Sequence, residues 1–209
     1  MGAEVTEPGT VRPGGRTARV RTAVLRAAGD TLAERGFAHL DLADIARRAE
    51  VGKTTVYRRW GTVTGLVADL LTDMAEQSLP RTESGSLLGD LKANARLVRR
   101  TLADPRQGAL FKAVIAAATC EAKTAEALHR FYEIRVKEWA PCVQQAIDRG
   151  EVPKETDTHE VIRAVSAPLY YRLLTSRDPL DEAAADRAAE AAAAAARAGV
   201  YVRSEAGLV

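Results

Sequence analysis

Residues 41 to 60 read Asp41-Leu-Ala-Asp-Ile-Ala-Arg-Arg-Ala-Glu-Val-Gly-Lys-Thr-Thr-Val-Tyr-Arg-Arg-Trp60, and this stretch decides the fold. Asp41 is a good N-cap, because its carboxylate can accept hydrogen bonds from the free amides of a helix's first turn. Apolar and small residues then recur at three- and four-residue steps, which indicates the inner face of a helix. These residues are Leu42, Ile45, Ala46 and Ala49.

A second short helix follows at once. The segment Glu50-Val51-Gly52 breaks the periodicity, which resumes in residues 53 to 60 with Val56 and Trp60 one turn apart. Two short helices joined by a tight turn that contains glycine, with small alanines where they cross, have the geometry of a helix-turn-helix. The stretch therefore predicts that motif, with residues 53 to 60 as its second helix.

The sequence before the motif predicts one further helix and an arm. Helical periodicity begins near Thr17 and should stop at Gly36, because glycine can adopt the left-handed conformation that closes a helix. Residues 1–15 are rich in glycine and proline and contain little that is apolar, which is typical of a disordered segment. We therefore expect a disordered basic arm over 1–15 and a three-helix domain over 16–62.

The sequence after the motif predicts helices only. Leucine, valine and methionine side chains define a connecting helix within residues 63–79, and a linker follows it. Five further helices with apolar stripes, separated by proline or glycine, are predicted at residues 87–102, 107–119, 125–147, 159–174 and 181–198. The expected fold class is all-α, with about nine helices and a C-terminal helical bundle domain over 63–209.

Charge is distributed unevenly along the chain. Residues 12–60 contain eleven Lys or Arg against five Asp or Glu, although the whole chain carries a net charge of only +2. Residues 61–80 contain three acidic residues and no basic one, and the remainder is close to balanced. A positive field confined to the first third of the chain is typical of a module that binds a polyanion.

The stretch from Arg21 to Leu71 resembles the tetracycline-repressor family of bacterial regulators. The resemblance rests on residues 41 to 60, above all on Lys53-Thr-Thr-Val-Tyr-Arg-Arg-Trp60, and the segment Pro168-Leu-Tyr-Tyr-Arg-Leu-Leu174 looks like one C-terminal subgroup. It implies an all-helical homodimer with an N-terminal DNA-reading domain and a C-terminal core that holds a small ligand. Val63 departs from the family pattern, which often has a phosphate-binding Lys there.

The helix over 53–60 supplies the expected contacts with double-stranded DNA. Lys53 and Arg58 can donate to guanine O6 and N7 in the major groove, and Thr54 can contact a base or a phosphate. By the resemblance, Thr55 and Tyr57 bind backbone phosphates, which orient the protein without reading sequence. Arg59 is expected to contact a phosphate or to form a structural ion pair.

Aromatic residues are few and gather in the later helices, which predicts a pocket for an unidentified small-molecule effector. The expected lining residues are Phe111, Phe131, Trp139, Tyr170 and Tyr171, with Tyr132 in the same cluster. Pro168 is expected to interrupt its helix and to free backbone carbonyls there. The alternative is that these aromatic residues only fill a core.

The last predicted helix is unusually rich in alanine, with twelve alanines among residues 181–199. Small side chains suit a helix that another helix approaches closely. We therefore expect two subunits to pair through the last two helices as a four-helix bundle. The alternatives are a surface helix with high helical propensity and a helical interaction scaffold.

No arrangement of residues predicts catalysis, a metal or a cofactor. Glu126 and His129 have a spacing used in di-iron bundles, but the second copy that such a site needs is missing. Two cysteines without CxxC spacing indicate buried thiols in a reducing cytoplasm, and no segment has the ~20 apolar residues of a membrane span. The sequence thus predicts a ligand-responsive repressor that binds a pseudo-palindromic operator. The alternative is a binding module or enzyme with a vestigial helix-turn-helix.

Overall fold

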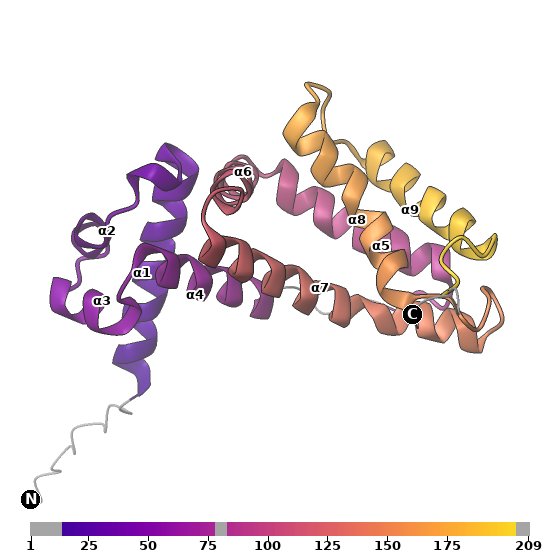
Figure 1. Cartoon of the computed structure of the whole chain (residues 1–209), viewed down its shortest axis with the longest axis horizontal. Coiled ribbons are helices and arrows are strands. Elements are labelled where there is room, and N and C mark those ends of the chain that lie inside the picture. The colour runs from indigo at the N-terminus through magenta and orange to yellow at the C-terminus, as the bar shows by residue number, and fades with distance from the viewer. Residues whose placement is uncertain (1–13, 78–82, 204–209) are drawn as a thin grey trace, which may run out of the picture.

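The computed structural model describes residues 14–77 and 83–203, and the segments that it describes contain nine α-helices (Figure 1). They are α1 (Gly14–Arg35), α2 (Leu42–Arg48), α3 (Lys53–Trp60), α4 (Val63–Glu76), α5 (Leu87–Ala103), α6 (Pro105–Ala118), α7 (Ala122–Asp148), α8 (Thr158–Thr175) and α9 (Glu182–Arg197). The only β pairing in these segments is an isolated bridge between Thr156 and Val202. The predicted all-α class is confirmed, whereas most of the predicted arm lies outside the described residues.

Local hydrogen bonds fix the helix-turn-helix as the sequence predicts. The Asp41 carboxylate accepts from the amides of Ala43 and Asp44 at 2.8 and 2.9 Å, so it caps α2. Gly36 ends α1 with a φ of 80°. The turn between α2 and α3 places its left-handed residue at Glu50, with a φ of 55°, and not at the glycine that follows in the turn.

The helices form two ends joined by α4 and α7 (Figure 1). Helices α1, α2 and α3 lie at one end, and α5, α8 and α9 lie at the other. Helix α1 packs along α6 and α4 packs along α7, so one connected set of buried side chains extends from the helix-turn-helix into the C-terminal helices. Helix α4 therefore contacts both α7 and the helices of the helix-turn-helix domain.

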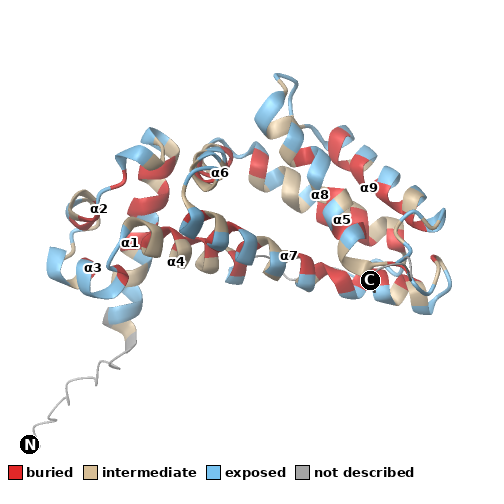
Figure 2. Cartoon of the chain, in the orientation of Figure 1, coloured by how far each residue is buried: buried red, intermediate tan, exposed pale blue. Residues whose placement is uncertain are grey.

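Helix α9 buries one stripe of its alanines within its own chain. Its buried stripe packs on α5 and α8 of the same chain (Figure 2). Ala192 belongs to this stripe and is 2% exposed. Ion pairs join α9 to α5, with Asp186 binding Arg96 at 2.9 Å and Glu190 binding Lys92 at 2.7 Å. The close approach that small residues permit therefore occurs within the chain.

Helix α8 continues through Pro168, so the predicted interruption is wrong. Pro168 lies on the exposed side of the helix. A proline there removes one backbone donor, and the helix continues on both sides of it, with Val165 and Leu169 fully buried in the core.

Candidate nucleic-acid interface and ligand cavity

Helix α3 turns one apolar edge inward and leaves its polar residues outside. Val56 is fully buried and Trp60 is 9% exposed. The polar residues that the sequence nominates for DNA are exposed, except for Thr55, which is half-buried. They are Lys53, Thr54, Tyr57, Arg58 and Arg59. At 100° per residue, Thr54 and Arg58 point most directly away from the buried edge.

The cations of the helix-turn-helix differ in whether they are paired. Arg47 and Arg48 form ion pairs with Asp44, and Arg48 also reaches Glu34. Within the described segments, Lys53 and Arg58 have no ion-pair partner. The unpaired positive charge is therefore on the exposed face of α3.

The two flanks of α3 have different surroundings. An open groove of about 590 Å³ separates the start of α1 from α3, and Thr55, Arg58 and Arg59 line it. The Arg59 guanidinium also lies 5.3 Å from the centre of the Trp60 ring, a cation–π contact. Tyr57, which is 48% exposed, lies on the other flank.

Asp69 of α4 ties the helix-turn-helix to the connecting helix. Its carboxylate accepts from Trp60 Nε1 at 2.8 Å and from Arg21 Nη2 at 2.8 Å, so α3, α1 and α4 meet at one anion. Burial by itself would raise the pKa of Asp69, but the hydrogen bonds from Arg21 and Trp60 outweigh it and hold that pKa below its ordinary value. Arg21 also pairs with Asp73, one turn along α4.

We expect Asp69→Asn to lower the free energy of unfolding by about 1–3 kcal/mol at pH 7, because it removes a charge-assisted bond from Arg21. Since the folded-state pKa is lowered, the carboxylate stabilises the fold above its unfolded pKa of about 3.9, and this contribution is lost as the pH falls through the folded pKa. The deficit of the variant should therefore shrink below about pH 4. Urea unfolding of the parent chain and of Asp69→Asn, from pH 7 to below about pH 4, measures this difference in the free energy of unfolding.

Glu126→Gln is the matched control, because Glu126 pairs with Arg130 on the exposed surface of α7. Its expected effect at pH 7 is below about 0.5 kcal/mol. An Asp69→Asn variant as stable as the parent at pH 7 would contradict the role given to this carboxylate.

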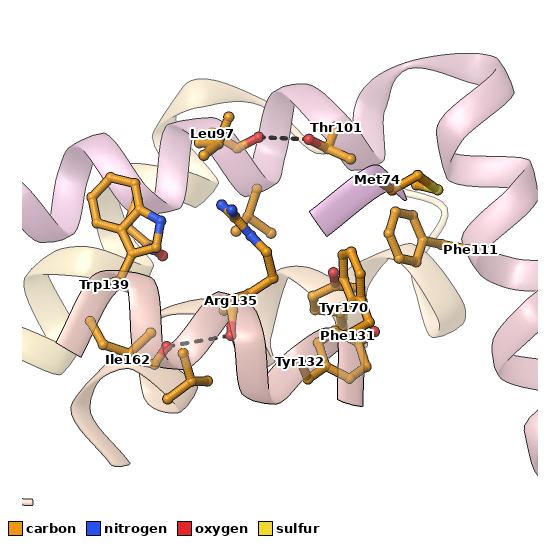
Figure 3. A pocket seen from close by; sticks show the side chains of 14 residues that line it. Met74, Leu97, Thr101, Phe111, Phe131, Tyr132, Arg135, Trp139, Ile162 and Tyr170 are labelled. Atoms are coloured by element: carbon orange, nitrogen blue, oxygen red, sulfur yellow. Dashed lines mark hydrogen bonds between the residues drawn. The ribbon is translucent and has the colours of Figure 1, made fainter. Parts of the chain in front are cut away.

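A cavity of about 100 Å³ lies among α4, α5, α6, α7 and α8 (Figure 3). Four of the five aromatic residues that the sequence predicts to line a pocket do line this cavity, namely Phe111, Phe131, Trp139 and Tyr170. Tyr171 does not, because consecutive helical residues point about 100° apart. It is 68% exposed on the outer face of α8, so its assignment to the pocket is corrected.

Aromatic rings form one wall of the cavity. The ring of Phe111 lies 5.5 Å from that of Phe131 and 6.0 Å from that of Tyr170, centre to centre. Tyr132 and Tyr170 meet edge to face at 5.3 Å. Burial raises the pKa of Tyr132 to about 12 and raises that of Tyr170 well above its ordinary value, so both phenols are neutral hydrogen-bonding groups at pH 7.

Nine of the fourteen lining residues were not predicted from the sequence, and three of them matter most here. Met74 comes from α4, Asn94 from α5 and Arg135 from α7. Arg135 follows the buried Phe131 by four residues, so helical periodicity alone places it on the inner face of α7. The four-residue spacing therefore predicts Arg135, whereas the clustering of aromatic residues does not.

The remaining residues considered from the sequence lie on the surface. Glu126 and His129 are both exposed on α7, and no cluster of three or more potential metal ligands occurs in residues 14–77 and 83–203. Cys142 is buried but Cys120 is exposed, so the expectation of two buried thiols is half wrong. Across the described helices, none is long and apolar enough to cross a membrane.

Comparison with known proteins identifies the family. The model described as "Bacterial regulatory proteins, tetR family" matches residues 24–70. The model described as "Tetracyclin repressor-like, C-terminal domain" matches residues 81–192. The two matches cover the helix-turn-helix and most of the C-terminal helices.

Individual relatives agree with these matches. The chain is similar to the uncharacterized HTH-type transcriptional regulator YdeS of Bacillus subtilis, with 31% identity over 161 residues, 77% of this chain and 81% of YdeS. The HTH-type transcriptional regulator AqdR of Rhodococcus erythropolis is 30% identical over 148 residues, 70% of each chain.

Solved structures share the fold. The TetR family transcription regulator SCO0332 superimposes with a TM-score of 0.67 at 26% identity, over 84% of this chain and 97% of that one. GusR of Salmonella enterica superimposes with a TM-score of 0.65 at 23% identity, over 86% and 92%. The chain therefore belongs to the TetR family of transcriptional regulators, which are DNA-binding helix-turn-helix proteins and not enzymes.

Proposed function

We propose that this TetR-family regulator is a ligand-responsive repressor that acts in the cytoplasm and binds a pseudo-palindromic operator as a homodimer. Residues 16–62 are the DNA-binding domain, and residues 63–209 are the ligand-binding and dimerisation domain, with a connecting helix over 63–79. The observation that carries the proposal is the pair of unpaired, exposed cations on α3, Lys53 and Arg58. Arg58 points directly away from the buried edge of α3, and Lys53 is exposed in its first turn.

The residues of α3 have different roles in this proposal. Arg58 and Lys53 read guanine in the major groove, and Thr54 contacts a base or a phosphate beside them. Thr55, Tyr57 and Arg59 contact phosphates on the two flanks and fix the register of the helix. Helical periodicity supports this division, because at 100° per residue Thr55 and Arg59 lie to one side of the outward edge and Tyr57 lies to the other.

We expect Thr55→Val to weaken binding to every duplex by a similar factor of about 5 to 150, because both subunits lose a phosphate hydrogen bond of about 0.5–1.5 kcal/mol that carries no base information. Fluorescence anisotropy on operator and scrambled duplexes measures both affinities. Thr119→Val, at the exposed end of α6, is the control and should change neither affinity. A loss confined to the operator would show that Thr55 reads bases.

The outer faces of α8 and α9 support the proposed homodimer. Tyr171 and Leu174, which are 68% and 48% exposed, stand one turn apart on α8. Helix α9, which packs against α8, also exposes small residues such as Ala191 and Ala194. A second copy that packs its own α8 and α9 here would form a four-helix bundle and cover both apolar side chains.

The connecting helix supports the proposed ligand response. Met74 lines the cavity, and Asp69, on the same helix, holds Trp60 and Arg21. A ligand that displaces Met74 shifts α4 and therefore shifts the end of α3. For a ligand to release DNA, it must bind one position of α4 better than the other.

Selection of binding sites from random duplex DNA with the purified full chain tests the proposal. We expect enrichment of inverted repeats whose half-site centres lie roughly 34–36 Å apart or a small multiple of that distance. The affinity for the selected site should fall steeply with salt. Enrichment of no sequence, or of single half-sites bound by one subunit, would contradict it.

A further inference from the structure

Arg135 is a charged residue in an otherwise uncharged cavity. Its side chain is 17% exposed, and its guanidinium points into the space between Trp139 and the tyrosine pair (Figure 3). Among the described residues that line the cavity, it is the only one with a charge. Burial lowers the pKa of Arg135, and the neighbouring Glu138 opposes that effect without overcoming it. Glu138 therefore offsets only part of the cost of burying the positive charge of Arg135.

The ion pair with Glu138 uses only part of the guanidinium. Glu138 lies one turn away on α7 and accepts from Nη1 of Arg135. Since a guanidinium has five N–H donors in a planar fork, its other donors remain available to a group inside the cavity. Glu138 itself does not line the cavity. A planar anion can therefore bind the open edge of the fork.

Two further polar groups of the cavity are unsatisfied. Asn94 and Trp139 are 3% and 2% exposed, and neither Asn94 Oδ1 nor Trp139 Nε1 has a hydrogen-bond partner in the described part of the chain. Buried polar atoms are nearly always hydrogen-bonded, so such atoms indicate a missing partner. The indole N–H of Trp139 can donate only, which fits an acceptor such as a carboxylate oxygen, whereas Asn94 Oδ1 accepts and needs an N–H or O–H donor from another part of a ligand or from water.

The rest of the cavity fits a flat apolar group. The rings of Phe111, Phe131 and Tyr170 form one wall, and aliphatic side chains from α5 and α8 form the others. Aromatic rings pack well edge to face against such a wall. The volume of about 100 Å³ is below the 150 Å³ of a cavity that admits benzene, so an aromatic ligand must enlarge it.

The cavity can be enlarged at Met74, and it adjoins a second hollow. Met74 is the lining residue from α4 and, with an unbranched side chain, can be displaced. A second hollow of about 390 Å³ between α7 and α8 shares Tyr132 and Tyr170 with the cavity. The cavity and this hollow therefore adjoin at the edge-to-face tyrosine pair, and a movement of the two rings would widen the passage between them.

We propose that the effector is a small aromatic carboxylate, whose carboxylate binds Arg135 and Trp139 Nε1 and whose ring packs on Phe111 and Phe131. The proposal rests on the proposed function only in calling this acid the effector. The binding site itself does not depend on DNA binding.

Matched acids and amides test the charge requirement. Isothermal titration of the full chain uses benzoate, phenylacetate and 1-naphthoate as probes, each compared with its primary amide. We expect at least one acid to bind about 10- to 100-fold more tightly than its amide, as a charge-assisted bond to Arg135 implies. The same acid should release operator DNA in an anisotropy assay, and its amide should not at equal concentration.

Variants on α7 test the residue. Arg135→Gln should remove the preference for the acid, and Arg135→Gln combined with Glu138→Gln should do the same without leaving a carboxylate unpaired. Arg130→Gln, exposed on the same helix, should retain the preference. If the single variant fails to fold, the double variant and the acid–amide comparison on the parent chain decide the question.

The outcomes separate this inference from the proposed function. Absence of binding by all three acids, equal binding of acid and amide, or an unchanged preference in the double variant would overturn the inference, even if operator binding is normal. If the chain prefers an acid through Arg135 but selects no operator, the inferred binding site stands and the proposed repressor function is refuted.

Discussion

Replacing Arg58 by alanine is expected to remove discrimination between operator and scrambled DNA while leaving the fold intact. Arg58 is exposed at the centre of the outward edge of α3 and has no ion-pair partner among the described residues. A bidentate contact with guanine is worth about 1–3 kcal/mol of discrimination at each half-site. Because a homodimer makes the contact twice, the ratio of the two affinities should fall by about 100-fold or more if each site contributes 1.4 kcal/mol.

Arg59→Ala is the matched control for this measurement. It removes the same charge from the same helix, but Arg59 stacks on Trp60 at the flank. Both variants lose general electrostatic attraction, so both should bind scrambled DNA somewhat more weakly. Only Arg58→Ala should change the specificity ratio. Fluorescence anisotropy on the two duplexes gives both values, and an unchanged ratio in Arg58→Ala would refute base reading by this residue.

The features that the sequence predicts correctly are those that neighbouring residues determine. The Asp41 cap depends on amides two and three residues away, and the end of α1 depends on the backbone freedom of Gly36. The inward edge of α3 follows from the spacing of Val56 and Trp60 alone. Local patterns therefore suffice for the helix-turn-helix and for which of its side chains face outward.

The features that the sequence misses depend on contacts between distant segments. Composition shows that α9 suits a close neighbour, but not that this neighbour is α5 of the same chain. Clustering of aromatic residues indicates a cavity, but Tyr171 differs from Tyr170 only by a rotation about the helix axis. The contact of Asp69 with Trp60 and Arg21 joins three helices, and no periodicity within one helix predicts it.

Introducing two charges on the outer face of α8 should separate the proposed dimer. In Tyr171→Glu combined with Leu174→Glu, each subunit would bury two unpaired carboxylates at the contact, and the two-fold axis doubles the cost. Both side chains are largely exposed in the single chain, so each subunit should remain folded. Monomers would hold one half-site at a time, and operator affinity should fall by about 100-fold or more because the linked second contact is lost.

Sedimentation velocity, circular dichroism and gel shift on the same samples test this last expectation. Ala116→Glu combined with Cys120→Glu adds the same two charges at exposed positions near the end of α6 and should leave a dimer with normal affinity. Ala192→Gln should instead lower the free energy of unfolding by about 1–3 kcal/mol, because Ala192 is buried within its own chain and a larger side chain overpacks that site. A Tyr171→Glu and Leu174→Glu variant that sediments as a dimer and binds the operator normally would show that the subunits pair through another face.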